Sequence, residues 1–146
     1  MKITYKGDYA LKAVLDLAIH YDSGVVTIHD LAKHIDASAK FLEQILFDLR
    51  KAGVVSSRRG KVGGYLLAKA PAQITVGEVV RFVEGPIEPI SCARQGYSDC
   101  GDIYKCVFRP IWQELASATS EIIDKITFAD LVNQLKKQNE TVIYQI

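Results

Sequence analysis

Three cysteines lie within one fifteen-residue window, and the chain of 146 residues contains no others. Seven residues separate Cys92 from Cys100, and five separate Cys100 from Cys106. Thiolates bind zinc and iron–sulphur clusters, which normally take four ligands. Three thiols cannot form disulphides without leaving one over. The pattern therefore favours a metal or cluster site that needs one more ligand, with three unrelated buried thiols as the alternative.

The segment around these cysteines, SCARQGYSDCGDIYKC, is rich in Gly, Ser and Asp. It lacks the apolar periodicity of a helix or strand, so we expect a loop over residues 86–108.

Basic residues are concentrated in the first half of the chain. Residues 1–69 contain 11 Lys and Arg against 7 Asp and Glu, and residues 70–146 contain 7 against 10. Five of the basic residues lie in residues 50–61 without an acidic one: Arg50, Lys51, Arg58, Arg59 and Lys61. Such a cluster is a candidate phosphate-binding surface, and an ordinary solvated surface is the alternative.

Apolar residues at helical spacing predict helices over about residues 6–21, 28–35 and 39–52. Thr27 and Ser38 stand at N-cap positions, and Gly53 at the last helix end. Two helices joined by a short turn are typical of a helix-turn-helix, whose second helix enters the major groove. Its exposed face would carry side chains that read base edges and phosphates: Ser38, Lys40, Glu43 and Gln44. Helical hairpins also occur in proteins that do not bind DNA.

The next segment predicts a β-hairpin, with strands at residues 54–57 and 65–67. Its turn contains Arg58, Arg59, Gly60 and Lys61. A hairpin directly after a helix-turn-helix is a wing, and this tip suits a narrow minor groove and its phosphates. A glycine-rich nucleotide cradle is disfavoured because no parallel βαβ pattern surrounds it.

The second half predicts three more helices. Thr75 caps a short one that ends near Gly85, and a longer one begins near Pro110. Its many apolar residues favour a dimerisation helix, with a lid on the same domain as the alternative. Thr127 caps a final helix, and the polar tail past Lys137 is expected to be loosely held.

Together these elements predict a mainly α fold with a small β-hairpin wing. We expect a winged helix-turn-helix domain at residues 1–85, a cysteine loop at 86–108, and the dimerisation helix with the C-terminal helix and tail at 109–146.

The length and the 49% hydrophobic content are those of one ordinary globular domain. The first twenty residues contain Asp8, Lys12 and Asp16 and resemble neither a signal peptide nor a membrane span, which favours a cytoplasmic protein. No Cys–His pair with a third supporting residue and no suitably placed pair of acids indicates an enzyme.

In this order, the stretches KGDYALKAVLDLA, FLEQILFDLRKAGVVSSRRGKVGGYLLAK, ITVGEVVRFVEGP, the three cysteines and ITFADL resemble one family over nearly the whole chain. It is the IscR and NsrR family of winged-helix, iron–sulphur-dependent bacterial transcription regulators. The resemblance implies a homodimer on a pseudo-palindromic site in double-stranded DNA, with recognition helices in successive major grooves. Matching positions place Ser38, Lys40, Glu43 and Gln44 on DNA and Arg59 and Gly60 at the wing tip.

The resemblance also implies that Cys92, Cys100 and Cys106 hold an iron–sulphur cluster, 2Fe–2S or 4Fe–4S. DNA affinity would then respond to nitric oxide, oxidative stress or iron–sulphur status. A regulator triggered by zinc or by bare redox-sensitive cysteines is the alternative. The first cysteine gap is longer than is usual in the family, which leaves the cluster type open.

The fourth ligand departs from part of the family. Members with a histidine ligand place it three residues after the last cysteine, where this chain has Arg109. The nitric-oxide-sensing branch uses an aspartate near the start of the first helix, donated by the partner subunit, and Asp8 matches it. Asp8 also suits a helix N-terminus without any ligand role. His34 is the second candidate, and we expect His20 and His29 to be structural or solvent-facing.

Overall fold

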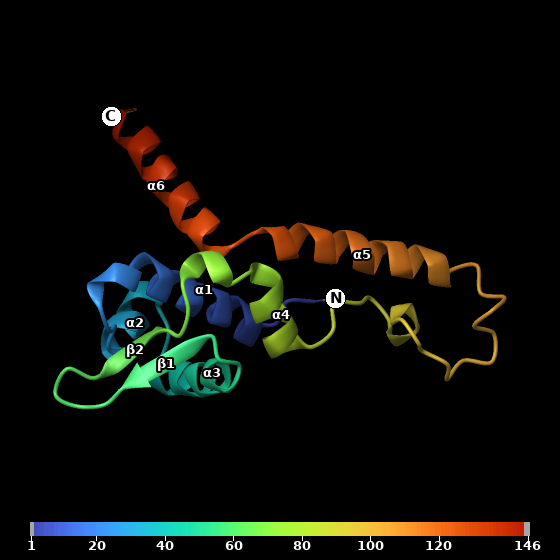
Figure 1. The fold of residues 1–146 in the computed structure, drawn as a ribbon, viewed down its shortest axis with the longest axis horizontal. Helices are drawn as coiled ribbons and strands as arrows, with labels where there is room; N and C mark the ends of the chain where they lie inside the picture. The colour runs from blue at the N-terminus through green and yellow to red at the C-terminus, as the bar shows by residue number, and fades with distance from the viewer. Residues whose placement is uncertain (1, 145–146) are drawn as a thin grey trace.

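Six α-helices and one two-stranded hairpin make up residues 2–144, the part of the chain that the computed structural model describes (Figure 1). In chain order the elements are α1 (Tyr5–Ile19), α2 (Ile28–Ile35), α3 (Ala39–Lys51), β1 (Val55–Arg58), β2 (Gly64–Leu67), α4 (Val76–Glu84), α5 (Arg109–Lys125) and α6 (Phe128–Tyr144). Short 3₁₀ turns lie at η1 (Tyr21–Ser23), η2 (Pro71–Gln73) and η3 (Ser91–Ala93). The predicted mainly α fold with a small hairpin is confirmed. None of the helices in residues 2–144 has the length and apolar composition needed to span a bilayer.

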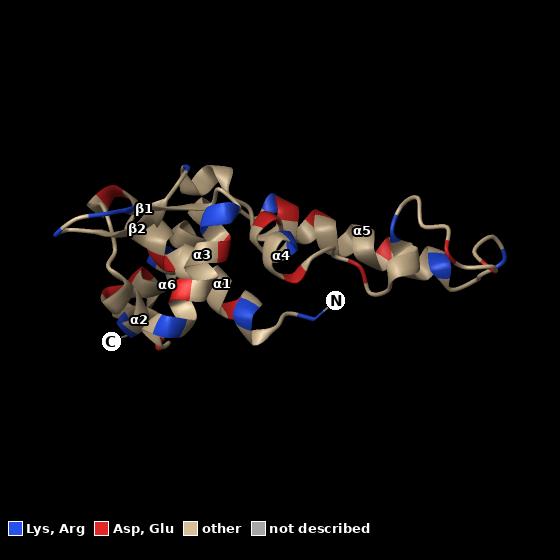
Figure 2. Ribbon diagram, turned by 90° about the horizontal axis from the view of Figure 1, so that it is seen from below, with Lys and Arg blue, Asp and Glu red and all other residues tan. Residues whose placement is uncertain are grey.

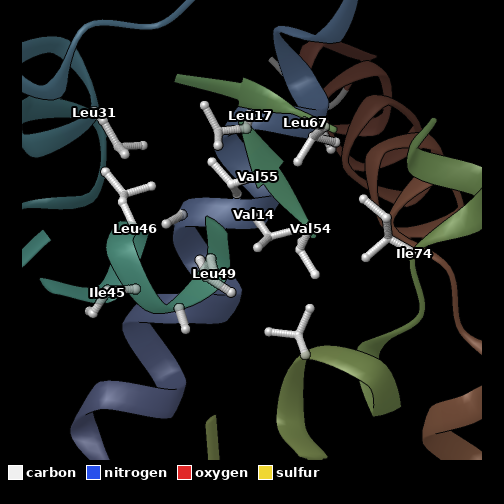
Figure 3. Packing of buried hydrophobic residues seen from close by; sticks show 14 of the residues in the cluster. Val14, Leu17, Leu31, Ile45, Leu46, Leu49, Val54, Val55, Leu67 and Ile74 are labelled. Carbon is white, nitrogen blue, oxygen red and sulfur yellow. The ribbon is translucent and has the colours of Figure 1, made fainter. Parts of the chain in front are cut away.

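Helix α1 is the central element, because α2, α3, α4 and α6 all pack against it (Figure 1). Its inner face contains Ala10, Ala13, Val14 and Leu17, none more than 2% exposed. Spacings of three and four residues place these side chains on one face. Figure 3 shows Val14 and Leu17 among Leu46, Leu49 and Val55, so α3 and the hairpin share one core with α1.

Side-chain caps define where α2, α3 and α4 begin. The Thr27 hydroxyl accepts from the Asp30 N–H at 3.1 Å, the Ser38 hydroxyl from Phe41 at 3.2 Å, and the Thr75 hydroxyl from Glu78 at 3.1 Å. Each bond satisfies an N–H that has no partner inside the helix. These are the caps that the sequence predicts.

The hairpin is held to the helical domain through Val26. Strands β1 and β2 are antiparallel, with Val55 opposite Leu67 and Arg58 opposite Gly64. The backbone of Val26 exchanges two hydrogen bonds of 2.8 Å with Tyr65, as a third short strand would. A Cβ at Gly64 would lie 2.5 Å from the Val26 carbonyl oxygen, so the approach requires glycine. The wing therefore has a fixed base.

Helix α5 is the least buried of the helices. It contacts α4 but has no buried residue, and it extends away from the winged domain (Figure 1). The Arg81 guanidinium of α4 donates to both carboxylate oxygens of Asp124, at 2.5 and 2.8 Å. The bond from Arg81 lowers the pKa of Asp124 below its usual value, so the clamp is complete above about pH 4 and weakens in acid. The helix does not cover the domain as a lid would.

Helix α6 returns to the winged domain. Thr75 and Thr127 form an antiparallel bridge, in which Val76 donates to the Ile126 carbonyl at 2.9 Å and Phe128 to that of Ile74 at 3.0 Å. Phe128 is fully buried in the core. Residues 138–144, where we expected a loosely held tail, continue the helix with their side chains exposed. Residues 145–146 lie outside the described part.

Candidate nucleic-acid interface and cysteine loop

Helix α3 has one buried face and one polar face. Leu42, Ile45, Leu46 and Leu49 are at most 1% exposed. The four residues predicted to read DNA, Ser38, Lys40, Glu43 and Gln44, are all exposed. Because α3 is anchored through its apolar face, these polar side chains have a fixed direction relative to the wing. Ser38 also caps the helix, and its hydroxyl proton remains free to bind a phosphate.

Two further residues belong to this exposed face. Phe47 is 53% exposed, and the ammonium of Lys51 lies 4.3 Å from the centre of its ring. Phe47 follows Glu43 by four residues, one helical turn. An exposed aromatic ring at this position can contact a thymine methyl group, and Lys51 can contact a phosphate. Phe47 was not selected from the sequence as a candidate contact. Its position one helical turn after Glu43 is the signal that could have identified it.

The wing and the start of α2 enclose a basic groove. It has a volume of about 470 Å³ and contains side chains from the wing tip, from α2 and from the end of α3. The lining includes Arg50, Arg58, Arg59 and Lys61, and no carboxylate among the described residues that line it. Figure 2 shows the basic residues at the tip of the β1–β2 hairpin.

This groove suits a nucleic-acid backbone. The N-terminus of α2, with Thr27 and His29 in the lining, adds the positive end of a helix dipole. At the tip, Gly60 adopts a φ of 124°, a conformation that favours glycine, and Lys61 and Arg59 are exposed. The sequence identified the wing residues of the groove but missed His29, which the fold brings beside them.

The cysteine loop connects α4 to α5. All three thiols are free; Cys92 and Cys106 are half-buried and Cys100 is exposed. Within residues 2–144 their sulphur atoms do not gather within 4.8 Å of one another. Three free thiols on one loop have the donor chemistry that iron–sulphur clusters and zinc require. The three cysteines therefore fit such a group by their chemistry. To bind it, the loop would have to bring their sulphur atoms closer together.

Arg109, which stands where some family members have a histidine ligand, organises this loop in another way. Its Nε donates to the backbone carbonyl of Cys92 at 2.9 Å. Since Arg109 is the first residue of α5, the bond ties the first cysteine to the start of that helix. The buried points of the loop are Ile87, which is 7% exposed, and Ala93 and Ile103, each 8% exposed.

The two candidates for the fourth ligand lie on different parts of the chain. Asp8 is in the first turn of α1, half-exposed, and accepts from the ammonium of Lys12 at 2.7 Å. This hydrogen bond raises the pKa of Lys12. His34 lies on α2, with its Nδ1 2.9 Å from the carboxylate of Asp16. In Figure 1, α2 and the loop lie at opposite ends of the molecule, so His34 is remote from the cysteines of its own chain.

A helix-turn-helix with an exposed polar recognition helix, followed by a basic wing, defines a winged-helix transcription regulator. The chain belongs to the Rrf2 family: residues 3–134 match the family model, which is described as an iron-dependent transcriptional regulator. The family resemblance inferred from the sequence is confirmed.

Relatives and solved structures agree with this family. The HTH-type transcriptional regulator IscR of Cronobacter sakazakii is 39% identical over 133 residues, which cover 91% of this chain and 81% of that protein. The structure of CymR, the global cysteine regulator of B. subtilis, has a TM-score of 0.76 and 34% identity, covering 92% of this chain and 98% of that one. The structure of T. potens IscR also has a TM-score of 0.76, with 33% identity, 94% of this chain and 90% of that one.

Replacing Arg59 by Ala should weaken operator binding by about 1–3 kcal/mol, because the wing would lose a positive charge that we expect to lie in the minor groove. The operator can be selected from a random DNA pool, and affinity measured by fluorescence anisotropy at several salt concentrations. Lys136→Ala, which removes an exposed charge from α6, is the matched control and should bind like the parent. Equal affinities for the Arg59→Ala variant and the parent would show that Arg59 of the wing does not contribute to operator binding.

Replacing Glu43 by Ala should reduce discrimination at one base pair by about 1–3 kcal/mol, because a carboxylate accepts from cytosine and repels other bases and phosphates. Overall affinity should change less than specificity, since a negative charge near DNA is also lost. Binding to the operator and to single-base variants gives both quantities. A uniform weakening on every DNA would show that Glu43 does not specify sequence.

Proposed function

We propose that this transcription regulator is a cytoplasmic homodimer whose affinity for DNA is controlled by an iron–sulphur cluster held by Cys92, Cys100 and Cys106. The observation that carries the proposal is the position of the three free thiols. They share the one loop that joins the winged domain to the exposed helix α5. A group that binds this loop therefore acts on the connection between the DNA-binding unit and the dimerisation helix.

The exposed surface of α5 supports the homodimer. Phe108, at its N-cap, and Ile111, Leu115 and Ile122 on the helix are between 49% and 63% exposed, and Ala118 is exposed as well. Together these five residues follow one another at intervals of three, four, three and four. That is the spacing of the apolar seam of a coiled coil. The seam of one chain needs a second apolar surface, and the same seam of a second chain supplies it.

Two-fold symmetry matches the DNA-binding surface. A dimer presents two copies of α3, and two recognition helices read two half-sites about one helical turn of DNA apart. Pairing through α5 would thus set the spacing of the two winged domains. We propose a pseudo-palindromic site in double-stranded DNA as the target.

The loop and its neighbours would transmit the state of the cluster. A bound cluster supplies a group that reacts with nitric oxide or oxygen and depends on iron supply. The residues of the chain do the rest: the three thiolates draw the loop together, and Arg109 fixes the Cys92 backbone to the start of α5. Arg81 and Asp124 then connect α5 to α4. Ordering of the loop therefore changes how the winged domains are held.

Asp8 of the partner subunit is our choice for the fourth ligand. Its carboxylate is half-exposed, and its bond to Lys12 is a surface ion pair within one helix. Such pairs contribute at most about 1 kcal/mol, so releasing Asp8 to another partner costs little. His34 is engaged with Asp16 at the other end of its own chain. An oxygen ligand binds iron less tightly than a thiolate, which suits a labile sensor.

Replacing Leu115 by Lys should convert the dimer to a monomer at micromolar concentration, because a charge would enter the centre of the α5 seam. Light scattering coupled to size-exclusion chromatography gives the mass. Ser117→Lys introduces the same side chain on another, exposed face of α5 and should remain dimeric. A Leu115→Lys variant that remains dimeric would exclude the seam as the dimer interface.

The cluster is tested by anaerobic reconstitution with iron and sulphide, followed by visible absorption. The parent should become coloured, and changing any one of Cys92, Cys100 or Cys106 to Ala should abolish a stable cluster, because two thiolates hold one poorly. Asp8→Ala should keep a cluster with altered absorption and faster loss in air, whereas His34→Ala should leave the spectrum unchanged. If His34→Ala alters the spectrum and Asp8→Ala does not, the fourth ligand is His34. A parent that remains colourless would contradict the cluster and favour zinc or bare thiols as the trigger.

A further inference from the structure

Asp16, His20 and His34 form a second cluster of metal-ligating side chains, on the opposite side of the molecule from the cysteines. Asp16 lies in the last turn of α1, His20 is the C-cap residue of that helix, and His34 comes from the last turn of α2. Each offers a ligand atom within 4.8 Å of the others, and this is the one such group that residues 2–144 contain. The family's iron–sulphur loop contributes no residue to it.

The carboxylate of Asp16 is the centre of this cluster. It is 7% exposed and is the one buried charged side chain among the described residues. Its Oδ2 lies 2.9 Å from the Nδ1 of His34 and 3.6 Å from the Nδ1 of His20. Burying a carboxylate is costly unless cationic or hydrogen-bonding partners surround it. His34 therefore contacts the carboxylate directly, whereas the Nδ1 of His20 lies 2.8 Å from the backbone carbonyl oxygen of Asp16, which is its nearer partner.

The arrangement of the two imidazoles beside the carboxylate suits a shared metal ion. Their rings are nearly parallel, with an angle of 13° and centroids 5.1 Å apart. A single hydrogen bond from His34 would already satisfy Asp16, and two protonated imidazoles at this separation repel each other. A divalent ion instead accepts a lone pair from one nitrogen of each imidazole and balances the negative charge of the carboxylate. His₂ with one carboxylate is a common donor set for zinc, with water in the remaining position.

An ion can reach the cluster from solvent. The side chains of His20 and His34 are 36% and 39% exposed. An open cavity of about 390 Å³ lies beside them and is lined by Asp16 and His34 together with Lys12 and Asp36. The two carboxylates of the lining, Asp16 and Asp36, outweigh the single positive charge of Lys12 for an entering cation.

We propose that Asp16, His20 and His34 bind one zinc ion or a similar divalent transition metal. Binding through the Nδ1 of His34 requires that nitrogen to be unprotonated: in a neutral imidazole the proton then resides on Nε2, and an imidazolium must release one proton to solvent, so affinity decreases in acid. The ion would bridge α1 and α2. His34 stands two residues before Asp36, whose left-handed backbone, with φ of 52°, makes the turn into α3. Metal binding would therefore stiffen the base of the recognition helix.

The test uses the full chain with Cys92, Cys100 and Cys106 all changed to Ser, so that thiolates do not compete. Calorimetric titration with Zn²⁺ should give one ion per chain, and Co²⁺ should give visible absorption bands without a sulphur charge-transfer band. His34→Gln and His20→Gln should each weaken Zn²⁺ binding by tenfold or more, by the loss of one of three ligands. His29→Gln removes an exposed histidine of the same helix α2 and should bind like its parent.

Circular dichroism of each variant establishes that it is folded. Should the triple-serine chain fail to fold, the same titrations apply to the otherwise unchanged chain, where His34→Gln should lower the zinc content by one ion per chain. Zinc binding that is absent, or equal in His34→Gln and in the parent, would overturn the proposal. Because the cysteines are absent or unchanged in each comparison, the outcome is independent of the iron–sulphur proposal.

Discussion

The burial of one face of α3 against α1 and the hairpin is the interaction on which the rest of the structure depends. Four aliphatic side chains of α3 are essentially inaccessible: Leu42, Ile45, Leu46 and Leu49. Burying each stabilises the fold by about 1.5–3 kcal/mol, well above the contribution of an exposed ion pair. This packing determines which way Lys40, Glu43 and Gln44 face, and it anchors the strand that begins the wing. The DNA-binding surface is thus a consequence of the core.

Outside this core the chain is organised by polar clamps and not by burial. The Arg81–Asp124 pair and the bond from Arg109 to Cys92 hold α5 and the loop at their ends, while the apolar seam of α5 remains exposed. Partly exposed contacts of this kind are weak and can be rearranged at low cost. In such a fold the winged domain is rigid and the cysteine loop and α5 are loosely attached to it. DNA binding by the winged domain can then be controlled through the loop. The iron–sulphur proposal rests on that division.

The sequence predicted much of this fold because its signals were local. Thr27, Ser38 and Thr75 each cap a helix three residues before the N–H that they accept from. The extent of the last helix was predicted less well, because residues 138–141 are polar and the apolar Val142 and Ile143 are adjacent in sequence, so no apolar periodicity marks the end of α6. The sequence also identified the exposed polar residues of α3 and the wing.

The tertiary associations were beyond local reasoning. His29 joins the wing groove through the packing of α2 beside the hairpin, and His34 meets Asp16 across two helices, eighteen residues apart in sequence. Neither contact follows from a spacing within one element. The ligand roles of Asp8 and the cysteines remain predictions, since they concern a group and a second subunit that one chain does not contain.

The most direct measurement of the central claim compares the operator affinity of the dimer with and without its cluster. Both forms come from one anaerobic preparation, are titrated against the same DNA at the same salt concentration, and are checked to have the same mass. Control through the loop predicts that the affinities differ by tenfold or more, which corresponds to at least about 1.4 kcal/mol. Equal affinities of the cluster-containing and cluster-free dimers would contradict it.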